Sequence, residues 1–223
     1  MVELITGLDA EVIAANRERV RGEIAQALER VGDSDREVAV LAATKYVARA
    51  DMPILAQAGI HLVGENRAQD LQAKAETHGD MFEWHFIGQL QSRRVRLIVP
   101  YVRMIHSVAS ESALSELERR RELARGDLRI LIEVNLAGET GMDGIAPEQL
   151  ESLLARAPFP VAGLMTMPPL TRDPQESRRW FRALRELRDE HGLEHLSMGT
   201  SQDYLVAVEE GATIVRIGTS LYH

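Results

Sequence analysis

Residues 38–45 read Val-Ala-Val-Leu-Ala-Ala-Thr-Lys, an apolar stretch that ends in a threonine and a lysine. A short apolar run with β-branched residues predicts a buried β-strand. Side chains alternate between the two faces of a strand, so Lys45 shares a face with Leu41 and Ala43. If the opposite face meets helices, Lys45 points into the fold at the end of this strand.

Seven similar runs follow along the chain, and segments with helical spacing separate them, for example around Leu150, Leu153 and Leu154. We therefore expect a helix after each strand. The eight predicted strands are Val38–Ala43, His61–Val63, Trp84–Ile87, Met104–Val108, Arg129–Val134, Val161–Met165, His195–Met198 and Thr213–Ile217. This alternation predicts parallel strands closed into a TIM-type (β/α)8 barrel, with an open doubly wound sheet as the alternative.

An additional amphipathic helix is expected before the first strand, across the outside or the bottom of the barrel. Its apolar stripe comprises Ile13, Val20, Ile24, Ala27, Leu28 and Val31. No Gly/Ser-rich or Pro-rich linker interrupts the chain, so we expect residues 1–223 to form a single domain.

Composition narrows the class of function. Of the 223 residues, 45% are hydrophobic and 27% charged, which is typical of a soluble globular protein. The net charge of −8 argues against nucleic acid and anionic membranes as partners. The absence of cysteine excludes thiolate chemistry and fits a reducing compartment. No signal peptide or membrane span is recognised, so we expect a cytoplasmic protein.

Polar residues gather where the predicted strands end, and barrels of this kind carry their sites in the loops at the carboxyl ends of the strands. These residues are Thr44, Lys45, the segment 64–66, Gly88, Asn135, the segment 197–199 and the segment 216–220. A functional site at one end of the barrel is therefore expected. The histidines His61, His106 and His195 stand singly, and we expect no metal site.

Lys45 is the candidate nucleophile of this site. Desolvation at an apolar barrel mouth would lower the pKa of its ammonium group and free an amine that attacks carbonyls. The alternative is that Lys45 opens a solvated loop, the usual environment of lysine.

Two turns rich in glycine and hydroxyl groups, residues 197–201 and 218–220, follow the last two predicted strands. Backbone amides of such turns bind phosphate, and the loops after strands seven and eight are the recurrent phosphate site of this barrel class. The alternative is that Ser201 and Ser220 only cap helices or form turns.

Arg216 lies within the last predicted strand and should face the interior, where a buried guanidinium needs an acceptor. A ligand could supply that acceptor, or Glu65 or Glu133 could form a structural ion pair with it. His85, between Trp84 and Phe86, is interpreted as a wall of the site rather than a proton-transfer group. The arginine-rich stretches 119–121 and 178–179 are interpreted as solvated helix faces.

Six motifs occur in an order that resembles the pyridoxal phosphate homeostasis protein family. They are Thr-Lys (44–45), Gly-Glu-Asn (64–66), Trp-His-Phe-Ile-Gly-Gln-Leu-Gln-Ser (84–92), Gly-Leu-Met (163–165), Ser-Met-Gly-Thr-Ser (197–201) and Val-Arg-Ile-Gly-Thr (215–219). The resemblance implies a free-standing barrel of the alanine racemase type, with pyridoxal 5'-phosphate (PLP) as an internal aldimine on Lys45.

The same resemblance implies roles for further residues. Phosphate contacts carry over to Ser197, Gly218 and Thr219, and the ring-nitrogen contact to Arg216. Asn66, His85, Met165 and Gly199 fall near the cofactor. The sequence departs from the family at Gln89, often proline; Ala109, often aspartate; Met142, often lysine; and Thr200, often methionine. The role of a basic patch at position 142 is therefore not carried over.

We expect a monomeric, non-catalytic carrier that holds PLP, limits the free aldehyde in the cytoplasm and passes the cofactor to apo-enzymes. Arginine keeps its proton, so a ring nitrogen beside Arg216 stays a weak electron sink. The sequence ends directly after the eighth strand, which leaves no length for the second domain of a racemase. The alternatives are a PLP-dependent amino-acid racemase, a cofactor-free Schiff-base aldolase that uses Lys45, or an interaction module.

Overall fold

The computed structural model describes residues 4–139 and 141–223. Eight parallel strands pair in sequence order, and β8 pairs back with β1 to close a barrel. The strands are β1 Ala39–Ala43, β2 Leu62–Glu65, β3 Glu83–Phe86, β4 Met104–Val108, β5 Arg129–Glu133, β6 Val161–Met165, β7 His195–Thr200 and β8 Ile214–Ile217. The predicted barrel is confirmed, and the open sheet is wrong. Predicted and observed strand ends differ by at most two residues.

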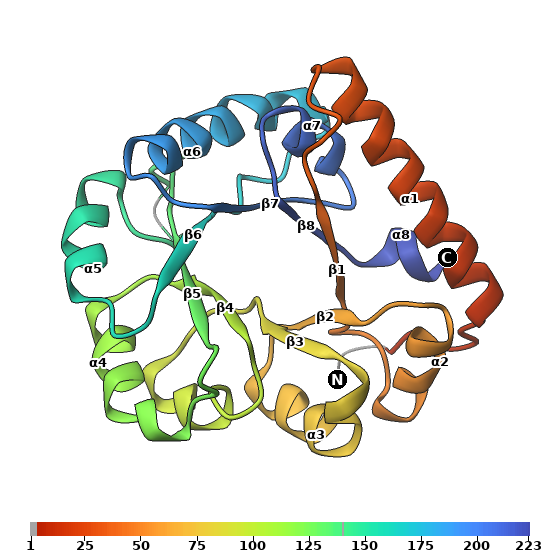
Figure 1. The fold of residues 1–223 in the computed structure, drawn as a ribbon, viewed down its shortest axis with the longest axis horizontal. Coiled ribbons are helices and arrows are strands. Elements are labelled where there is room, and N and C mark those ends of the chain that lie inside the picture. Colours follow the sequence, from red (N-terminus) through yellow and green to blue (C-terminus); the bar gives the residue numbers. More distant parts are fainter. Residues whose placement is uncertain (1–3, 140) are drawn as a thin grey trace.

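Helices form a ring outside the strands (Figure 1). They are α2 Met52–Gln57, α3 Ala68–His78, α4 Glu111–Arg119, α5 Leu150–Arg156, α6 Arg178–Glu190, α7 Tyr204–Glu209 and α8 Thr219–Tyr222. Short 3-10 helices span Arg49–Asp51, Gly79–Met81, Ser92–Leu97, Arg121–Leu123, Pro147–Gln149 and Pro174–Ser177.

The expectation of a regular helix after every strand is wrong at β3, which is followed by the 3-10 helix Ser92–Leu97. Val95 in this segment and Ile98 and Val99 just after it are β-branched, and Pro100 has no amide hydrogen to continue a helix.

The helix before the first strand is α1, Ala10–Arg30, and the side chain of Asp9 caps its first turn by accepting from the amides of Glu11 and Val12. It packs on the outside of the ring beside α7 and α8 (Figure 1). Five of the six predicted stripe residues are buried, but Val31 is 43% exposed. The helix ends at Arg30, and Gly32 turns the chain away with a φ of 70°, so Val31 leaves the buried face.

Two apolar layers flank the sheet, one between strands and helices and a smaller one inside the barrel. Leu41 belongs to the inner layer, with Leu131, Met165 and Ile214, whereas Ala42 belongs to the outer layer. The alternation predicted for β1 is therefore confirmed, and Lys45 follows on from the inner face.

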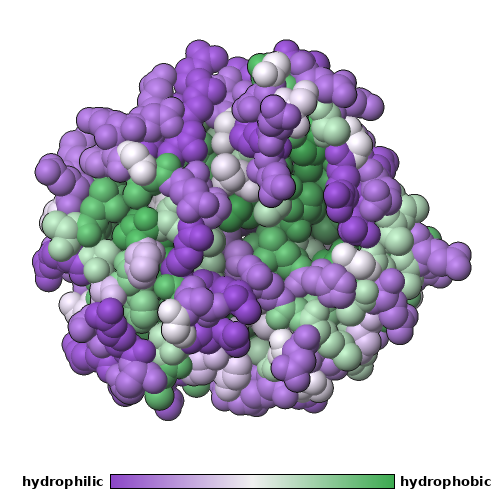
Figure 2. Space-filling view, in the orientation of Figure 1, coloured by the Kyte–Doolittle hydropathy of each residue, from purple (hydrophilic) through white to green (hydrophobic). Residues whose placement is uncertain are grey.

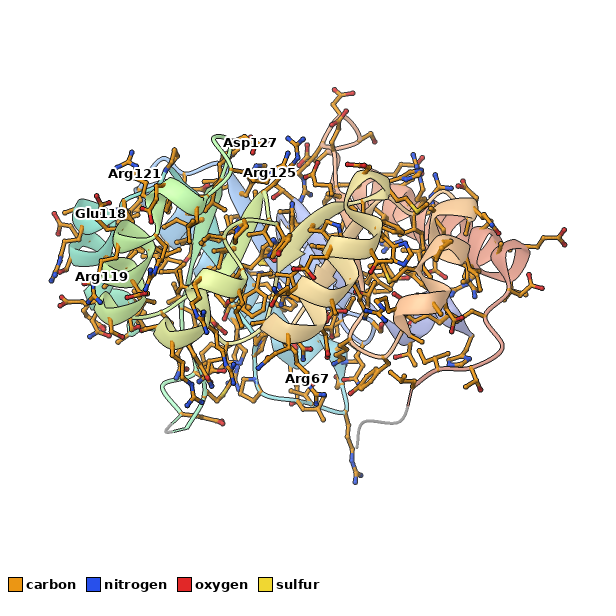
Figure 3. All side chains as sticks on the ribbon, turned by 90° about the horizontal axis from the view of Figure 1, so that it is seen from below. Arg67, Glu118, Arg119, Arg121, Arg125 and Asp127 are labelled. Atoms are coloured by element: carbon orange, nitrogen blue, oxygen red, sulfur yellow. The ribbon has the colours of Figure 1, made fainter. Side chains whose placement is uncertain are left out.

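The arginine-rich stretch 119–121 is solvated, as predicted. Arg119 pairs with Glu116 at 3.0 Å and Arg121 with Glu118 at 3.7 Å, on the flank of the molecule where Figure 3 labels Glu118, Arg119 and Arg121. Arg178 differs, because it bridges α6 to Glu209 of α7 at 2.5 Å. Within residues 4–139 and 141–223, no helix combines the length and apolar character that crossing a membrane requires.

A buried ion pair fixes the carboxyl ends of β1 and β2. Lys74, on α3, places Nζ 2.5 Å from Oε1 of Glu65 and donates to the carbonyl oxygen of Thr44 at 2.8 Å. The Thr44 hydroxyl donates to the same Glu65 oxygen at 2.8 Å. All three residues are buried. The backbone just before Lys45 is thus held by a lysine that the sequence did not single out.

We expect Lys74→Met to lower the free energy of unfolding by about 3–5 kcal/mol, because it leaves the Glu65 carboxylate buried without a counter-charge. Adding Glu65→Gln should recover most of this loss. Urea denaturation measures both changes. Arg19→Met breaks the exposed Arg19–Glu23 pair and serves as the control, and a loss for Lys74→Met no larger than in that variant would contradict a structural role.

Candidate functional site at the carboxyl ends of the strands

The two ends of the barrel are distinguished in Figure 3. Arg67, just after β2, lies at one end, and Arg125 and Asp127, just before β5, lie at the other. Closure of the barrel pairs Arg216 of β8 with Leu41 of β1. The last residues of the chain are thereby brought to β1, the strand that ends two residues before Lys45.

Lys45 is half-buried at the rim, with Nζ 4.9 Å from the centroid of the Tyr46 ring. Lys45 is therefore not enclosed in the apolar mouth, where we expected it. It does not extend into solvent either. Ala43 and Thr44, the two residues before Lys45, are each held through their carbonyl oxygens. Lys74 donates to the Thr44 carbonyl, and the buried hydroxyl of Tyr222 donates to the Ala43 carbonyl at 3.0 Å. Lys45 and Lys74 are the only lysines of the chain. Because Lys74 is buried in its ion pair, Lys45 is the accessible one.

Arg216 faces the interior, as predicted, and is 5% exposed. Its Nη1 donates to Ser197 Oγ at 2.6 Å, and its Nη2 donates to the Thr166 carbonyl at 3.0 Å and to the sulfur of Met167. Burial lowers the pKa of Arg216 to about 10, against the opposing charges of Glu133 and Asp203. The guanidinium thus stays protonated at neutral pH.

Neither predicted carboxylate forms an ion pair with Arg216 within 4 Å in the described part of the chain. Glu65 is wrong as a partner because Lys74 occupies it. Glu133, at the end of β5, acts on Arg216 through its field only. Burial raises the pKa of Glu133 to about 7, with the charge of Asp143 adding to the rise and Arg216 opposing it. A carboxyl group that titrates near neutrality therefore lies at this end of the barrel.

The loops after β7 and β8 meet, as the phosphate-site interpretation requires. Ser201 Oγ accepts from the Gly218 amide at 3.2 Å. Thr219 and Ser220 begin α8, where first-turn amides have no acceptor within the helix. Gly199 has a φ of 90°, and a Cβ there would lie 2.6 Å from Cβ of Ala207, so the close approach of α7 requires glycine.

Ser197 lies apart from this turn, although it was expected to contact the same phosphate. Its hydroxyl is 2.6 Å from Nη1 of Arg216 and 2.8 Å from Nδ1 of His106, inside the barrel. Met165 is buried in the inner layer and pairs with Ser197 across β6 and β7. The predicted phosphate turn 197–201 included Ser201, but the family resemblance selected Ser197, whereas Ser201 is the hydroxyl beside Gly218. The signal was present in the motif, but the motif contains two serines.

Asn66 presents an acceptor without a partner. Its Oδ1 is buried, and no donor reaches it from the described residues. The backbone here is crowded, because a Cβ at Gly88 would lie 2.1 Å from the Asn66 carbonyl oxygen. Buried acceptors without a partner are rare in native proteins, and a ligand donor is one way to complete them.

His85 forms no direct hydrogen bond with another candidate and reaches Ser197 only through His106. Its Nε2 lies 3.1 Å from Glu83 Oε1 and its Nδ1 lies 2.9 Å from His106 Nε2. It lines a hollow of about 1020 Å³ at the amino ends of the strands, which we call the amino-end hollow. Figure 2 shows this face hollowed over β1, with hydrophobic side chains inside. The hollow thus lies at the end opposite Lys45, away from the converging polar groups.

The family departures have local explanations at two positions. Gln89 donates to Asp143 at 2.6 Å, which ties the loop after β3 to the loop after β5. Thr200 donates its hydroxyl to Asp203 at 3.1 Å. Met142 is half-buried and carries no charge. In the described part of the chain, no three His, Asp or Glu side chains gather closely enough to hold a metal ion.

Comparison with known proteins assigns the family. The family model described as alanine racemase, N-terminal domain, matches residues 16–223. The pyridoxal phosphate homeostasis protein of Aquifex aeolicus is 41% identical over 215 residues, covering 92% of this chain and 94% of that protein. The chain belongs to the pyridoxal phosphate homeostasis protein family. The family predicted from the six motifs is thereby confirmed.

Two solved structures are similar to this chain over nearly its whole length. A protein of Bifidobacterium adolescentis is 32% identical with a TM-score of 0.86, covering 99% of this chain and 98% of its own. PipY of Synechococcus elongatus, a structure with PLP bound, is 30% identical with a TM-score of 0.80, covering 95% of this chain and 100% of its own. The family likeness therefore extends over the whole barrel.

We expect Glu133→Gln to remove a pH-dependent loss of stability. Native Glu133 keeps its proton up to about pH 7, whereas the unfolded carboxyl loses it near 4.5, so wild-type stability falls as the pH rises between these values. The variant should gain up to about 3 kcal/mol over the wild type on going from pH 4 to pH 8. Urea unfolding at both pH values measures this gain. Glu148→Gln, at an exposed site, is the control, and parallel profiles for Glu133→Gln and wild type would contradict the prediction.

Proposed function

We propose that this protein binds PLP at the carboxyl ends of the strands and holds it as a Schiff base on Lys45. The observation that carries the proposal is the convergence of Lys45, Arg216 and the turn at Gly218 through the pairing of β1 with β8. PipY with PLP bound, related over 95% of this chain, supports it.

The residues at this end fit the separate parts of the ligand. An aldehyde requires an amine, and Lys45 is the accessible lysine. A phosphate suits the free amides of Thr219 and Ser220 with the hydroxyl of Ser201. The buried Asn66 Oδ1 accepts a hydroxyl donor on the ring, and Arg216 donates to a ring nitrogen. Met165 and Gly199 belong to the surrounding wall.

Three carried-over contacts change in this proposal. We assign the phosphate to the Ser201 hydroxyl and the amides of Thr219 and Ser220. The Ser197 hydroxyl is already engaged by Arg216 and His106, and the Gly218 amide by Ser201. We assign no direct ligand contact to His85, because Glu83 and His106 occupy both of its ring nitrogens.

We propose that the protein acts as a carrier in intracellular vitamin B6 homeostasis. Bound PLP supplies an electron sink when its ring nitrogen is protonated. Arg216 stays charged at neutral pH, so it donates a hydrogen bond to that nitrogen without transferring a proton. Such a ring favours retention of the aldehyde over carbanion chemistry. Release to apo-enzymes and a monomeric state complete the proposal.

A weak amino-acid racemase is the second candidate, and Glu133 is the observation that favours it. Its carboxyl group, with a pKa near 7, is suited to exchanging a proton at neutral pH. Turnover would require a base of this kind beside the ligand.

We expect the purified protein mixed with PLP to show an imine absorption band, and borohydride reduction to leave the label on Lys45. Because the chain has two lysines, peptide mass mapping distinguishes Lys45 from Lys74 directly. Lys45→Ala should lose the label and keep the wild-type circular dichroism. Lys45→Arg keeps the charge without a reactive amine and should also lose the label. A label on Lys74, or none, would sink the Schiff-base proposal.

We expect the loaded protein to leave L-alanine and D-alanine unchanged over hours, because Arg216 keeps the ring a weak electron sink. Chiral chromatography of the amino acid measures this. Racemization by the wild type that disappears in Glu133→Gln would replace the carrier role with the racemase role.

A further inference from the structure

Five side chains form a hydrogen-bonded chain through the inside of the barrel. It begins with Glu83 at the amino end of β3, passes through His85, His106 and Ser197, and ends on Arg216 of β8. The four donor–acceptor distances, in this order, are 3.1, 2.9, 2.8 and 2.6 Å. All members except Glu83 are at most 5% exposed. The chain therefore connects the amino-end hollow with the buried guanidinium.

Proton counting gives this chain a direction. Arg216 can only donate, so Ser197 Oγ accepts from it, and an ionised Glu83 can only accept. The hydrogen bond from His85 lowers the pKa of Glu83, which keeps it ionised at neutral pH. When His85 carries a single ring proton and donates it from Nε2 to Glu83, its Nδ1 must accept.

His106 is then fixed by its neighbours. Its Nε2 must donate to His85, so its Nδ1 must accept the hydroxyl hydrogen of Ser197. Every bond therefore points from Arg216 toward Glu83. Burial is the largest cause that lowers the pKa of His106, and the positive charge of Arg216 lowers it further, so His106 stays neutral. Glu133 and Asp203 are the acidic groups that act on the other end of the chain, at Arg216.

We propose that His106 and His85 are positioning residues. They fix the Ser197 hydroxyl, which in turn orients Arg216 toward the ring nitrogen of the bound ligand, and they connect Arg216 to Glu83. The inference rests on the proposed function, because the ligand is the group that Arg216 would meet. Glu83 lies outside the carboxyl-end site, and among the described residues no other side-chain hydrogen bond of Glu83 leads to that site.

The chain limits what Arg216 offers. Ser197, Thr166 and Met167 take three of its five N–H groups, which leaves two for a ligand. Ser197 gives its hydrogen to His106 and so acts only as an acceptor toward Arg216. If a substitution removes the acceptor Nδ1 of His106, the Ser197 hydroxyl is free to rotate. The Arg216 guanidinium then loses one of the acceptors that hold its orientation.

The first test compares two substitutions of His106. His106→Asn places an amide oxygen near the position of Nδ1 and can still accept from Ser197, whereas His106→Leu cannot. Absorbance titration should show PLP bound about 5-fold more weakly by His106→Leu, the effect of about one hydrogen bond, and within about 2-fold of wild type by His106→Asn. Equal affinities in the two variants would overturn the positioning role.

The second test acts at the distant end and does not disturb the interior. Glu83 and Glu194 are matched, since each is partly exposed, places a carboxylate oxygen within 3.3 Å of a histidine Nε2 (His85 or His195) and pairs with an arginine (Arg103 or Arg129). Only Glu83 belongs to the chain. Removal of the Glu83 charge should weaken the polarisation of the hydrogen bonds between Glu83 and Arg216. The Arg216 guanidinium would then carry more positive charge near the ligand ring. This charge should lower the pH at which the imine band changes.

Glu83→Gln should therefore lower that pH by about half a unit more than Glu194→Gln does. A charge effect through space would shift both variants alike. Equal shifts would thus contradict a role for the chain.

A measurement without PLP separates this inference from the proposed function. Nitrogen-15 shifts of the imidazole rings should show the proton on Nε2 of both His85 and His106 at neutral pH. A proton on Nδ1 of His106 would overturn the inference, even if Lys45 carries PLP. Failure of Lys45 to form the adduct would overturn the proposed function. The nitrogen-15 shifts would still decide the direction of the hydrogen bonds in the chain.

Discussion

The pairing of β8 with β1 is the constraint on which the rest of the structure depends. It turns one face of every strand into the wall of a closed interior, where a polar side chain has no access to bulk water. His85, His106, Ser197 and Arg216 lie in that interior and must satisfy one another. Closure also brings the end of the chain beside Lys45. The pairing of β8 with β1 therefore both closes the barrel and assembles the candidate site.

The strands, their direction and the end that carries the polar residues were predictable, because each depends on local patterns. Alternation in 38–45 was sufficient to place Leu41 inside, and the parallel arrangement then placed Lys45 and Gly218 at one end. Nothing in the residues alone identified the ligand class beyond a carbonyl and a phosphate. PLP entered through the resemblance, on motifs that span most of the chain.

The partners inside the barrel were not predictable from the sequence. A lysine on a helix suggests solvent, yet Lys74 turns inward to Glu65, nine residues earlier in the chain. His106 stood alone in the sequence, although its partners lie 21 and 91 residues away. Such pairings depend on the register between strands, and a one-residue shift would send each side chain to the other face. Local patterns carry no information about that register.

The burial of Lys74 has a chemical consequence for a protein proposed to hold an aldehyde. The chain carries 26 basic side chains, of which 24 are arginines and two are lysines. Arginine supplies positive charge and hydrogen bonds without the nucleophilic amine that condenses with aldehydes. With one of the two lysines locked in an ion pair, the side-chain amines offer a reactive carbonyl a single point of attachment. In the proposed carrier role, this composition would give a defined stoichiometry and would limit modification of the other side chains by the bound aldehyde.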